Sequence, residues 1–142
     1  MIPQAPNTNH KTWECFETYL RAQALNGYEV YVSMSSYGTG GIGAASASVV
    51  NTINNGKVTV PANVWKVAVL LKTGDNDISC VTNATRVIAI NTPNINSTSA
   101  NWKDYIVTVR GIKNAAGYNL LSNLPQNIQD VLEKLIDPVH FM

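Results

Sequence analysis

The residues of this chain best suited to chemistry recur at a regular spacing near its start. Asn9, Trp13, Glu17 and Arg21 are each four positions apart, and side chains at that spacing lie on nearly one face of an α-helix. Amide and carboxylate oxygens are ligands for hard cations, and a guanidinium binds anions. On spacing alone, however, the set is more typical of an exposed polar stripe that carries a weak Glu17–Arg21 ion pair.

Composition limits the classes of protein to consider. Hydrophobic residues make up 45% of the 142 residues and charged residues 13%, which indicates a globular domain and not a disordered chain. The net charge of +1 means that the protein as a whole is not strongly basic, so binding to nucleic acid would need a local cluster of cations. No stretch approaches the roughly 20 apolar residues of a membrane span. Cys15 and Cys80 are predicted to be two separate buried thiols, although a disulfide between them is also open.

The elements that must position these residues can be inferred from periodicity and turn residues. After a loop-like opening, the apolar spacing predicts a helix over residues 11–25, which ends at Asn26-Gly27. Residues 35–48 are rich in Gly, Ser and Ala and predict a long loop. β-branched and apolar runs predict strands, and a second helix is expected near the end; the strands are 28–33, 57–61, 65–72, 86–90 and 105–109, and the helix is 125–135. This order predicts one α+β domain over residues 1–142 with a largely antiparallel sheet.

Longer stretches carry a resemblance that the spacing alone does not. They follow one order along nearly the whole chain: Met1-Ile2-Pro3-Gln4, Asn9 to Arg21, Glu29-Val30-Tyr31-Val32, Val58 to Val67 with its Val-Pro and Trp-Lys pairs, Ile90 to Asn94, Trp102 to Tyr105, and Gly117-Tyr118 to Leu124-Pro125. This set resembles the DNA/RNA non-specific endonucleases, a family of ββα-metal or His-Me finger nucleases. The resemblance implies the α+β fold of that family, with helices flanking the sheet and with the N-terminal part missing.

The resemblance also implies roles for four residues. Asn9 aligns with the sole protein ligand of a Mg²⁺ or Mn²⁺ ion, and Glu17 aligns with the acidic residue that orients the water shell of the ion. Arg21 aligns with an arginine near the scissile phosphate, where it would bind substrate and offset charge in the transition state. Gln4 matches a glutamine near the same site.

For four other residues we prefer a structural interpretation. Trp13, Pro61, Trp65 and Lys66 are predicted to pack in the core or at strand edges.

The general base of the family is not found in this chain. It is a histidine in an Asp-Arg-Gly-His motif that precedes the asparagine, whereas the histidines here are His10 and His140. On a helix His10 would point about 100° away from Asn9, and His140 lies in a terminus that we expect to fray. The sequence is therefore interpreted as the C-terminal part of such a nuclease, beginning at an internal methionine. Alone, it should expose an apolar sheet edge and face, and it should be poorly soluble or associate with a complementing segment or a second copy.

Two functions follow from the resemblance, and a third interpretation remains. The first is a metal-dependent endonuclease that hydrolyses DNA and RNA to 5′-phosphorylated products, inactive as this fragment alone. The second is a non-catalytic relic or accessory chain that binds nucleic acid or phosphate. The third is an ordinary α+β domain whose resemblance is accidental. The family favours a secreted or periplasmic location, and no membrane partner is expected.

Overall fold

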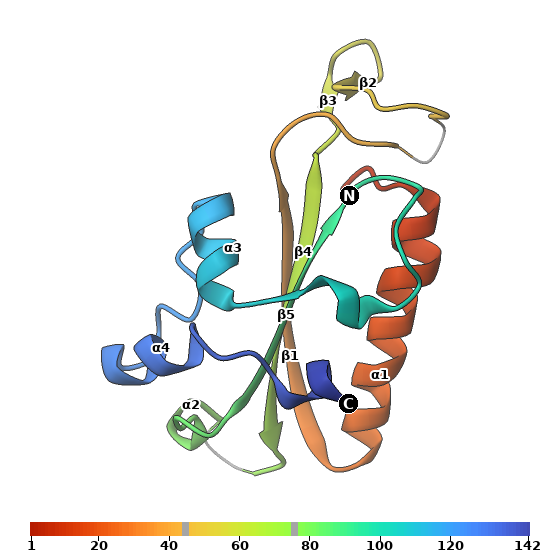
Figure 1. The fold of residues 1–142 in the computed structure, drawn as a ribbon. Coiled ribbons are helices and arrows are strands. Elements are labelled where there is room, and N and C mark those ends of the chain that lie inside the picture. The colour runs from red at the N-terminus through yellow and green to blue at the C-terminus, as the bar shows by residue number, and fades with distance from the viewer. Residues whose placement is uncertain (44–45, 75–76) are drawn as a thin grey trace.

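A four-stranded antiparallel sheet forms the centre of the fold, in the order β1-β4-β5-β6 (Figure 1). The computed structural model describes residues 1–43, 46–74 and 77–142. The strands of the sheet are β1 (Tyr28–Tyr37), β4 (Asn63–Lys72), β5 (Arg86–Pro93) and β6 (Ile106–Val107). The short strands β2 (Thr52–Ile53) and β3 (Val58–Thr59) form a separate hairpin. The antiparallel sheet with helices on its faces confirms the predicted α+β class.

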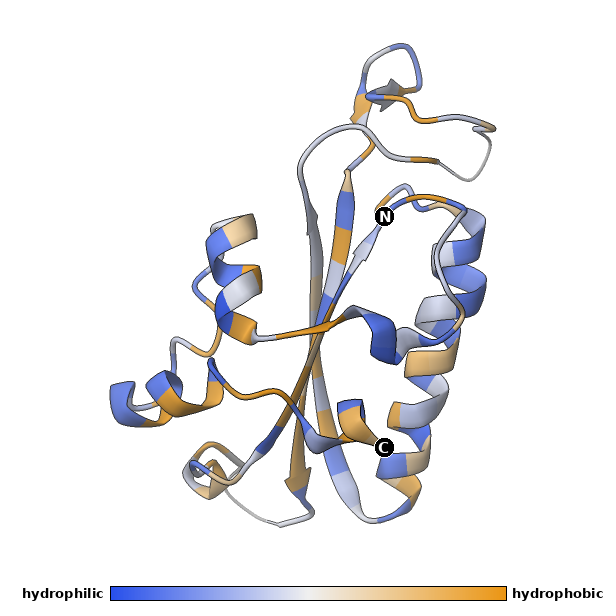
Figure 2. Ribbon diagram, viewed as in Figure 1, coloured by the Kyte–Doolittle hydropathy of each residue, from blue (hydrophilic) through white to orange (hydrophobic). Residues whose placement is uncertain are grey.

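Strand β4 is buried on both faces, as its nearly continuous apolar sequence predicted. In Figure 2 the hydrophobic colour runs along much of this strand. Its side chains alternate between two cores: Val64, Ala68 and Leu70 pack in one, and Trp65, Val67 and Leu71 in the other. One charged side chain, Lys66, lies within this run and is itself buried.

Helices cover the two faces of the sheet (Figure 1). The first core lies under α1 (Glu14–Leu25), which contributes Phe16 and Leu20. The second core lies under α3 (Val109–Ala116) and α4 (Gln126–Leu132), which contribute Ile112 and Leu132. The shorter elements are α2 (Asp77–Cys80), η2 (Trp102–Tyr105) and η3 (Pro138–Phe141).

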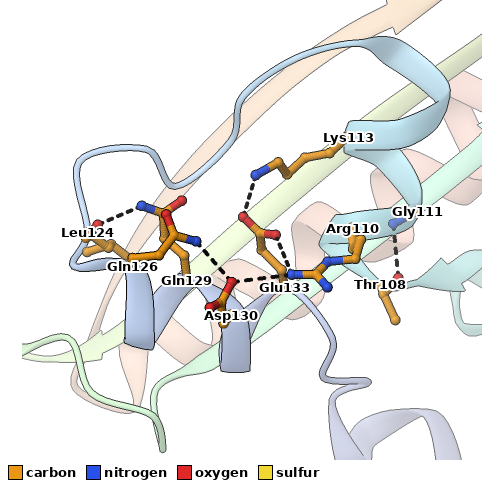
Figure 3. A network of polar contacts seen from close by, with 9 residues as sticks. All are labelled: Thr108, Arg110, Gly111, Lys113, Leu124, Gln126, Gln129, Asp130 and Glu133. Carbon is orange, nitrogen blue, oxygen red and sulfur yellow. Dashed lines mark hydrogen bonds and ion pairs between the residues drawn. The ribbon is translucent and has the colours of Figure 1, made fainter.

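The layer of α3 and α4 is joined by a network of charges (Figure 3). The carboxylate of Glu133, just after α4, accepts hydrogen bonds from Lys113 and Arg110 on α3. The backbone N–H of Arg110 also donates to the Glu133 carbonyl oxygen. This carboxylate therefore ties the C-terminal segment of the chain to the face opposite α1.

The start of the first helix differs from the prediction. Helical structure begins before residue 11, because a π-helical segment η1 (Thr8–Trp13) runs directly into α1. The hydroxyls of Thr8 and Thr12 are buried and donate to carbonyl oxygens at the end of β5 and in the segment after it, at Pro93, Ile95 and Ser99. These contacts fix the buried side of η1 and leave Asn9 on its exposed side.

Two predicted boundaries are wrong in an instructive way. Strand β1 runs to Tyr37, so the predicted loop begins later than residue 35, and residues 44–45 of that loop lie outside the described residues. The run predicted as a strand over 105–109 keeps only two strand residues, and Val109 begins α3. The Thr108 side chain accepts a hydrogen bond from the N–H of Gly111 as an N-cap, and Gly117 ends the helix at φ 76°. Capping therefore overrode the β-propensity of the run.

The two thiols are separate, as predicted, but the prediction that they are buried is wrong. Cys15 and Cys80 are both exposed and not bonded to each other.

The predicted apolar sheet edge is present: β1 is the terminal strand of the sheet, and Tyr31, Val32 and Met34 on it are exposed. Among the residues that the structure describes, none of the helices has the length and apolar character needed to cross a bilayer.

Candidate functional site

A π-helical turn changes the relative direction of the predicted site residues. In an uninterrupted α-helix at about 100° per residue, Asn9 and Glu17 would point about 80° apart. The π-helical segment η1, which contains Asn9 and ends before Glu17, accommodates one extra residue, and this reduces the angle to about 20°. Arg21 follows Glu17 by one regular α-helical turn, an offset of about 40°. The helix therefore presents Asn9, Glu17 and Arg21 on one side, although the assignment of their roles stays a prediction.

The Asn9 amide is accessible. Its side chain is exposed, and within the described residues it has no hydrogen-bond partner, while its backbone N–H donates to the Ala5 carbonyl oxygen at 3.1 Å. The oxygen of this amide can therefore be offered to a ligand without breaking a contact inside the protein.

Gln4 is placed by a buried asparagine from the end of β5. The Asn94 side-chain oxygen accepts from the N–H of Ala5 at 2.7 Å, and its NH₂ group donates to the Pro3 carbonyl oxygen at 3.0 Å. These two bonds hold the backbone on both sides of Gln4. The same NH₂ group donates to the Pro61 carbonyl oxygen at 2.9 Å. Asn94 thus fixes the segment that leads into η1, a role that no pattern in the sequence predicts.

The close packing around Asn94 requires a glycine nearby. A Cβ atom at Gly41 would lie 2.1 Å from the Pro61 carbonyl oxygen and 2.7 Å from the Asn94 amide nitrogen. Real Cβ contacts do not become so short, so any larger residue at position 41 would displace the segment that Asn94 holds.

Glu17 is paired with a cation from the sheet. Its Oε1 atom accepts a hydrogen bond from Nζ of Lys66 on β4, whose side chain is 3% exposed, whereas the Glu17 side chain is 46% exposed. Nζ of Lys66 also lies 4.0 Å from the centroid of the Trp13 ring. In the part of the chain that the structure describes, Oε2 of Glu17 has no protein partner. The carboxylate is therefore held at one oxygen and open at the other.

The Glu17–Arg21 ion pair that the spacing favoured is absent among the described residues, because Lys66 takes Glu17. Arg21 is exposed, and its Nη2 donates to Oγ1 of Thr18 at 2.8 Å. Its guanidinium keeps donors free for an anion.

A second cation on the α1 face of the sheet serves the fold instead. Arg86, at the start of β5, donates to both carboxylate oxygens of Asp137 at 2.9 Å and to the hydroxyl of Tyr19. The hydrogen bond to Asp137 raises the pKa of the Arg86 guanidinium further above its ordinary value. Through these bonds Arg86, on β5, joins Asp137 in the C-terminal segment to Tyr19 on α1.

His10 lies at the surface as predicted, whereas His140 lies in the short helix η3 and not in a frayed terminus. His10 is exposed beside Asn9 on the first helical turns. His140 is exposed near the end of the chain, where Nδ1 lies 3.3 Å from the Lys103 carbonyl oxygen. Neither contacts the side chains of Asn9, Glu17 or Arg21 in the described structure.

Sequence reasoning missed the involvement of Lys66. It was interpreted as a packing residue, and it is buried as predicted, but its ammonium reaches the predicted site at Glu17. The available signal was a lysine within the apolar run Val64 to Leu71. A buried ammonium needs a partner, and only the fold shows that this partner is Glu17.

The predicted site is a surface and not a cavity. A hollow of about 300 Å³ is lined by apolar side chains that include Tyr31, Leu71 and Leu124, and none of the predicted site residues borders it. Within residues 1–43, 46–74 and 77–142, no group of three or more His, Cys, Asp or Glu side chains could hold a metal ion.

Comparison with known proteins identifies a family and a curated relative. The family model described as "DNA/RNA non-specific endonuclease" matches residues 1–127. A curated protein called "Nuclease" from Nostoc sp. is 35% identical over 137 residues, which are 96% of this chain and 46% of that protein. The chain therefore spans about half the length of the curated relative that it matches.

Proposed function

The chain belongs to the DNA/RNA non-specific endonuclease family, and from this premise we propose that it is the metal-binding part of an enzyme that hydrolyses phosphodiester bonds in DNA and RNA. The observation that carries the proposal is the shared side of the first helix, where Asn9, Glu17 and Arg21 are accessible together. Members of this family generally depend on a divalent metal ion.

The donor set fits a hard divalent cation such as Mg²⁺ or Mn²⁺. The exposed Asn9 amide offers a neutral oxygen, and the free Oε2 of Glu17 can accept hydrogen bonds from the water shell around such an ion. When bound, the ion would polarise the phosphate and offset charge on the leaving 3′ oxygen.

The other residues of the site act on the substrate. The exposed guanidinium of Arg21 can make two parallel hydrogen bonds to a phosphate and offset the charge that builds up on it. Gln4, held between the two Asn94 contacts, can add a neutral hydrogen bond to the nucleic acid. Because these groups address the phosphate and not the bases, the site would cut with little regard to sequence or sugar.

The general base belongs to another segment in this proposal, since neither His10 nor His140 lies beside the proposed site residues. We infer that the chain alone does not cut and that a complementing segment supplies the Asp-Arg-Gly-His histidine. The open β1 edge, with Val32 and Met34 exposed, supports pairing with such a segment or with a second copy.

The test is a nicking assay on supercoiled plasmid, with a structured RNA as second substrate. The chain is assayed alone and as a chimera in which it replaces the matching region of the Nostoc nuclease. We expect Mg²⁺-dependent cleavage of both substrates by the chimera, with 5′-phosphorylated ends detected by end-labelling before and after phosphatase treatment. Asn9→Ala in the chimera should lower the rate by at least about 100-fold, the scale of losing one group that acts on the transition state.

Two results would count against this assignment. A folded chimera that does not cut would favour the second candidate, a relic that binds nucleic acid or phosphate without catalysis, and retention of plasmid on the chain in a mobility-shift assay would support it. A chimera in which Asn9→Ala cuts as fast as the parent would show that the site lies elsewhere.

A further inference from the structure

Lys66 occupies a position in which a charge is unfavourable. Its side chain is 3% exposed in the central strand β4, between the buried residues Val64 and Ala68. Its partners across the sheet are Met34 on β1 and Ile90 on β5. A buried ammonium destabilises the fold unless its donors are satisfied, so an apolar side chain of similar length would be the simpler choice for the core.

The two contacts of this ammonium converge on the first helix. Nζ donates to Oε1 of Glu17 and lies 4.0 Å from the centroid of the Trp13 ring. Both partners belong to the helix that carries Asn9 and Arg21. The charge therefore acts on the helix face of the candidate site and on no other described carboxylate.

The effect on Glu17 is directional. Its side chain is 46% exposed, and a free carboxylate at such a position would sample several rotamers. The bond from Lys66 holds Oε1 and leaves Oε2 without a protein partner among the described residues. Trp13 limits the movement of the ammonium in turn, because its indole Nε1 donates to the buried hydroxyl of Thr92 at 3.0 Å.

We propose that Lys66 is a positioning residue for the metal site: through its bond to Oε1 it fixes the Glu17 carboxylate, whose Oε2 would accept hydrogen bonds from the water shell of a cation held by Asn9. Lys66 itself touches neither the cation nor the phosphate. The inference rests on the proposed function, because it assigns Lys66 a part in the same site. It predicts that Lys66 and Glu17 contribute to cation binding as one unit.

The test measures Mn²⁺ binding to the purified chain by electron paramagnetic resonance, which needs neither substrate nor catalysis. Lys66→Met should weaken Mn²⁺ binding by about tenfold, the scale found when a partner that orients a metal site is removed. Glu17→Gln should have a similar effect, and the double variant Glu17→Gln/Lys66→Met should be no weaker than either single variant. Lys66→Arg, which keeps the charge, should bind within about threefold of the parent chain.

Arg86→Met is the matched control, because it removes another cation from the same face of the sheet. Arg86 contacts Asp137, Tyr19 and Gln23 and does not contact Glu17. It should lower the Tm and leave the Kd for Mn²⁺ unchanged. If Lys66→Met does not fold, Lys66→Gln takes its place, with the same expected direction.

The outcomes separate this inference from the proposed function. If Asn9→Ala binds Mn²⁺ as tightly as the parent chain, the proposed metal site is wrong. If Asn9→Ala weakens binding but the Lys66 variants bind as the parent does, the role of Lys66 is overturned and the site stands. Additive effects of the Glu17 and Lys66 changes would also overturn it, since they would show that Lys66 does not act through Glu17.

Discussion

Two carboxylates on opposite sides of the sheet, Glu17 and Glu133, are both paired with cations, and they are paired in opposite ways. Glu133 is 4% exposed, and each of its oxygens is taken: Oε1 by Lys113 and Oε2 by Arg110 (Figure 3). Glu17 is 46% exposed and uses one oxygen, while its partner Lys66 is the buried member of the pair.

The difference separates an ion pair that joins parts of the fold from one that directs a side chain. When the anion is buried and both of its oxygens are paired, as in Glu133, removing it leaves both cations without their partner. The substitution therefore lowers the stability of the fold. When the cation is buried and the anion is half exposed, the anion still neutralises the buried charge, but its second oxygen stays free and can meet a ligand. The helix carrying Glu17 is anchored at its N-terminal end by the neutral hydrogen bonds of Asn94, Thr8 and Thr12.

The largest effect is expected at Glu133. Replacing Glu133 with Gln removes the negative charge that pairs with both Arg110 and Lys113. It should lower the free energy of unfolding by about 3 kcal/mol, the lower end of the range for a buried ion pair, because both cations can reach water. Urea unfolding followed by circular dichroism measures it. Asp130→Asn is the control: Asp130 is 52% exposed and lies 3.6 Å from Arg110, so its change should cost no more than about 0.5 kcal/mol. Equal effects of the two changes would contradict the comparison.

An intermediate effect is expected at Asn94. Asn94→Ala leaves the N–H of Ala5 and the carbonyl oxygens of Pro3 and Pro61 without their partner, and should cost about 2 kcal/mol. Because these bonds are neutral, the loss should be the same at low and high salt concentration. Asn91→Ala, which removes side-chain bonds to Tyr37 and Asn63 at a partly exposed position, should cost about 1 kcal/mol or less. A loss at Asn94 that disappears in high salt would show that charges, and not these bonds, anchor the segment.

The smallest effect on stability is expected at Glu17. Glu17→Gln keeps an oxygen for Nζ of the buried Lys66 and leaves the Trp13 ring over it, so the loss in the free energy of unfolding should be limited to about 1 kcal/mol. The same urea titration measures it beside Glu133→Gln. A loss as large as that at Glu133 would show that Glu17 serves mainly to neutralise the core and would remove the contrast between the two carboxylates.

Much of the fold could be predicted from local patterns. The apolar spacing from Trp13 to Leu20 predicted the buried stripe of the first helix, and Asn26-Gly27 predicted its end, where Gly27 has φ 87°. The run from Trp65 to Leu71 predicted the central strand. These signals are local because one face of an element must be buried whatever it packs against. The end of the last strand failed because the capping contact of Thr108 was not recognised in a β-branched run.

Less of the candidate site could be predicted. The residue types and spacing of Asn9, Glu17 and Arg21 are properties of the sequence, and so is the resemblance that gave them roles. Their alignment depends on the π-helical turn, for which the sequence carries no simple signal, and on the contacts of Thr8 and Thr12 with the end of β5 and the segment after it.

By itself, the sequence determined which side chains could do chemistry, which strand lies at the centre of the sheet and which family the chain resembles, because these depend on residue type and short-range periodicity. Tertiary structure alone decided that Lys66 and not Arg21 pairs with Glu17, and that Asn94 holds the backbone around Gln4. Lys66 and Glu17 are 49 positions apart in the sequence, and Asn94 is 89 positions from Ala5 and 91 positions from Pro3. The physical reason is that contacts over such separations exist only after the sheet and helix have packed, so no local pattern encodes them.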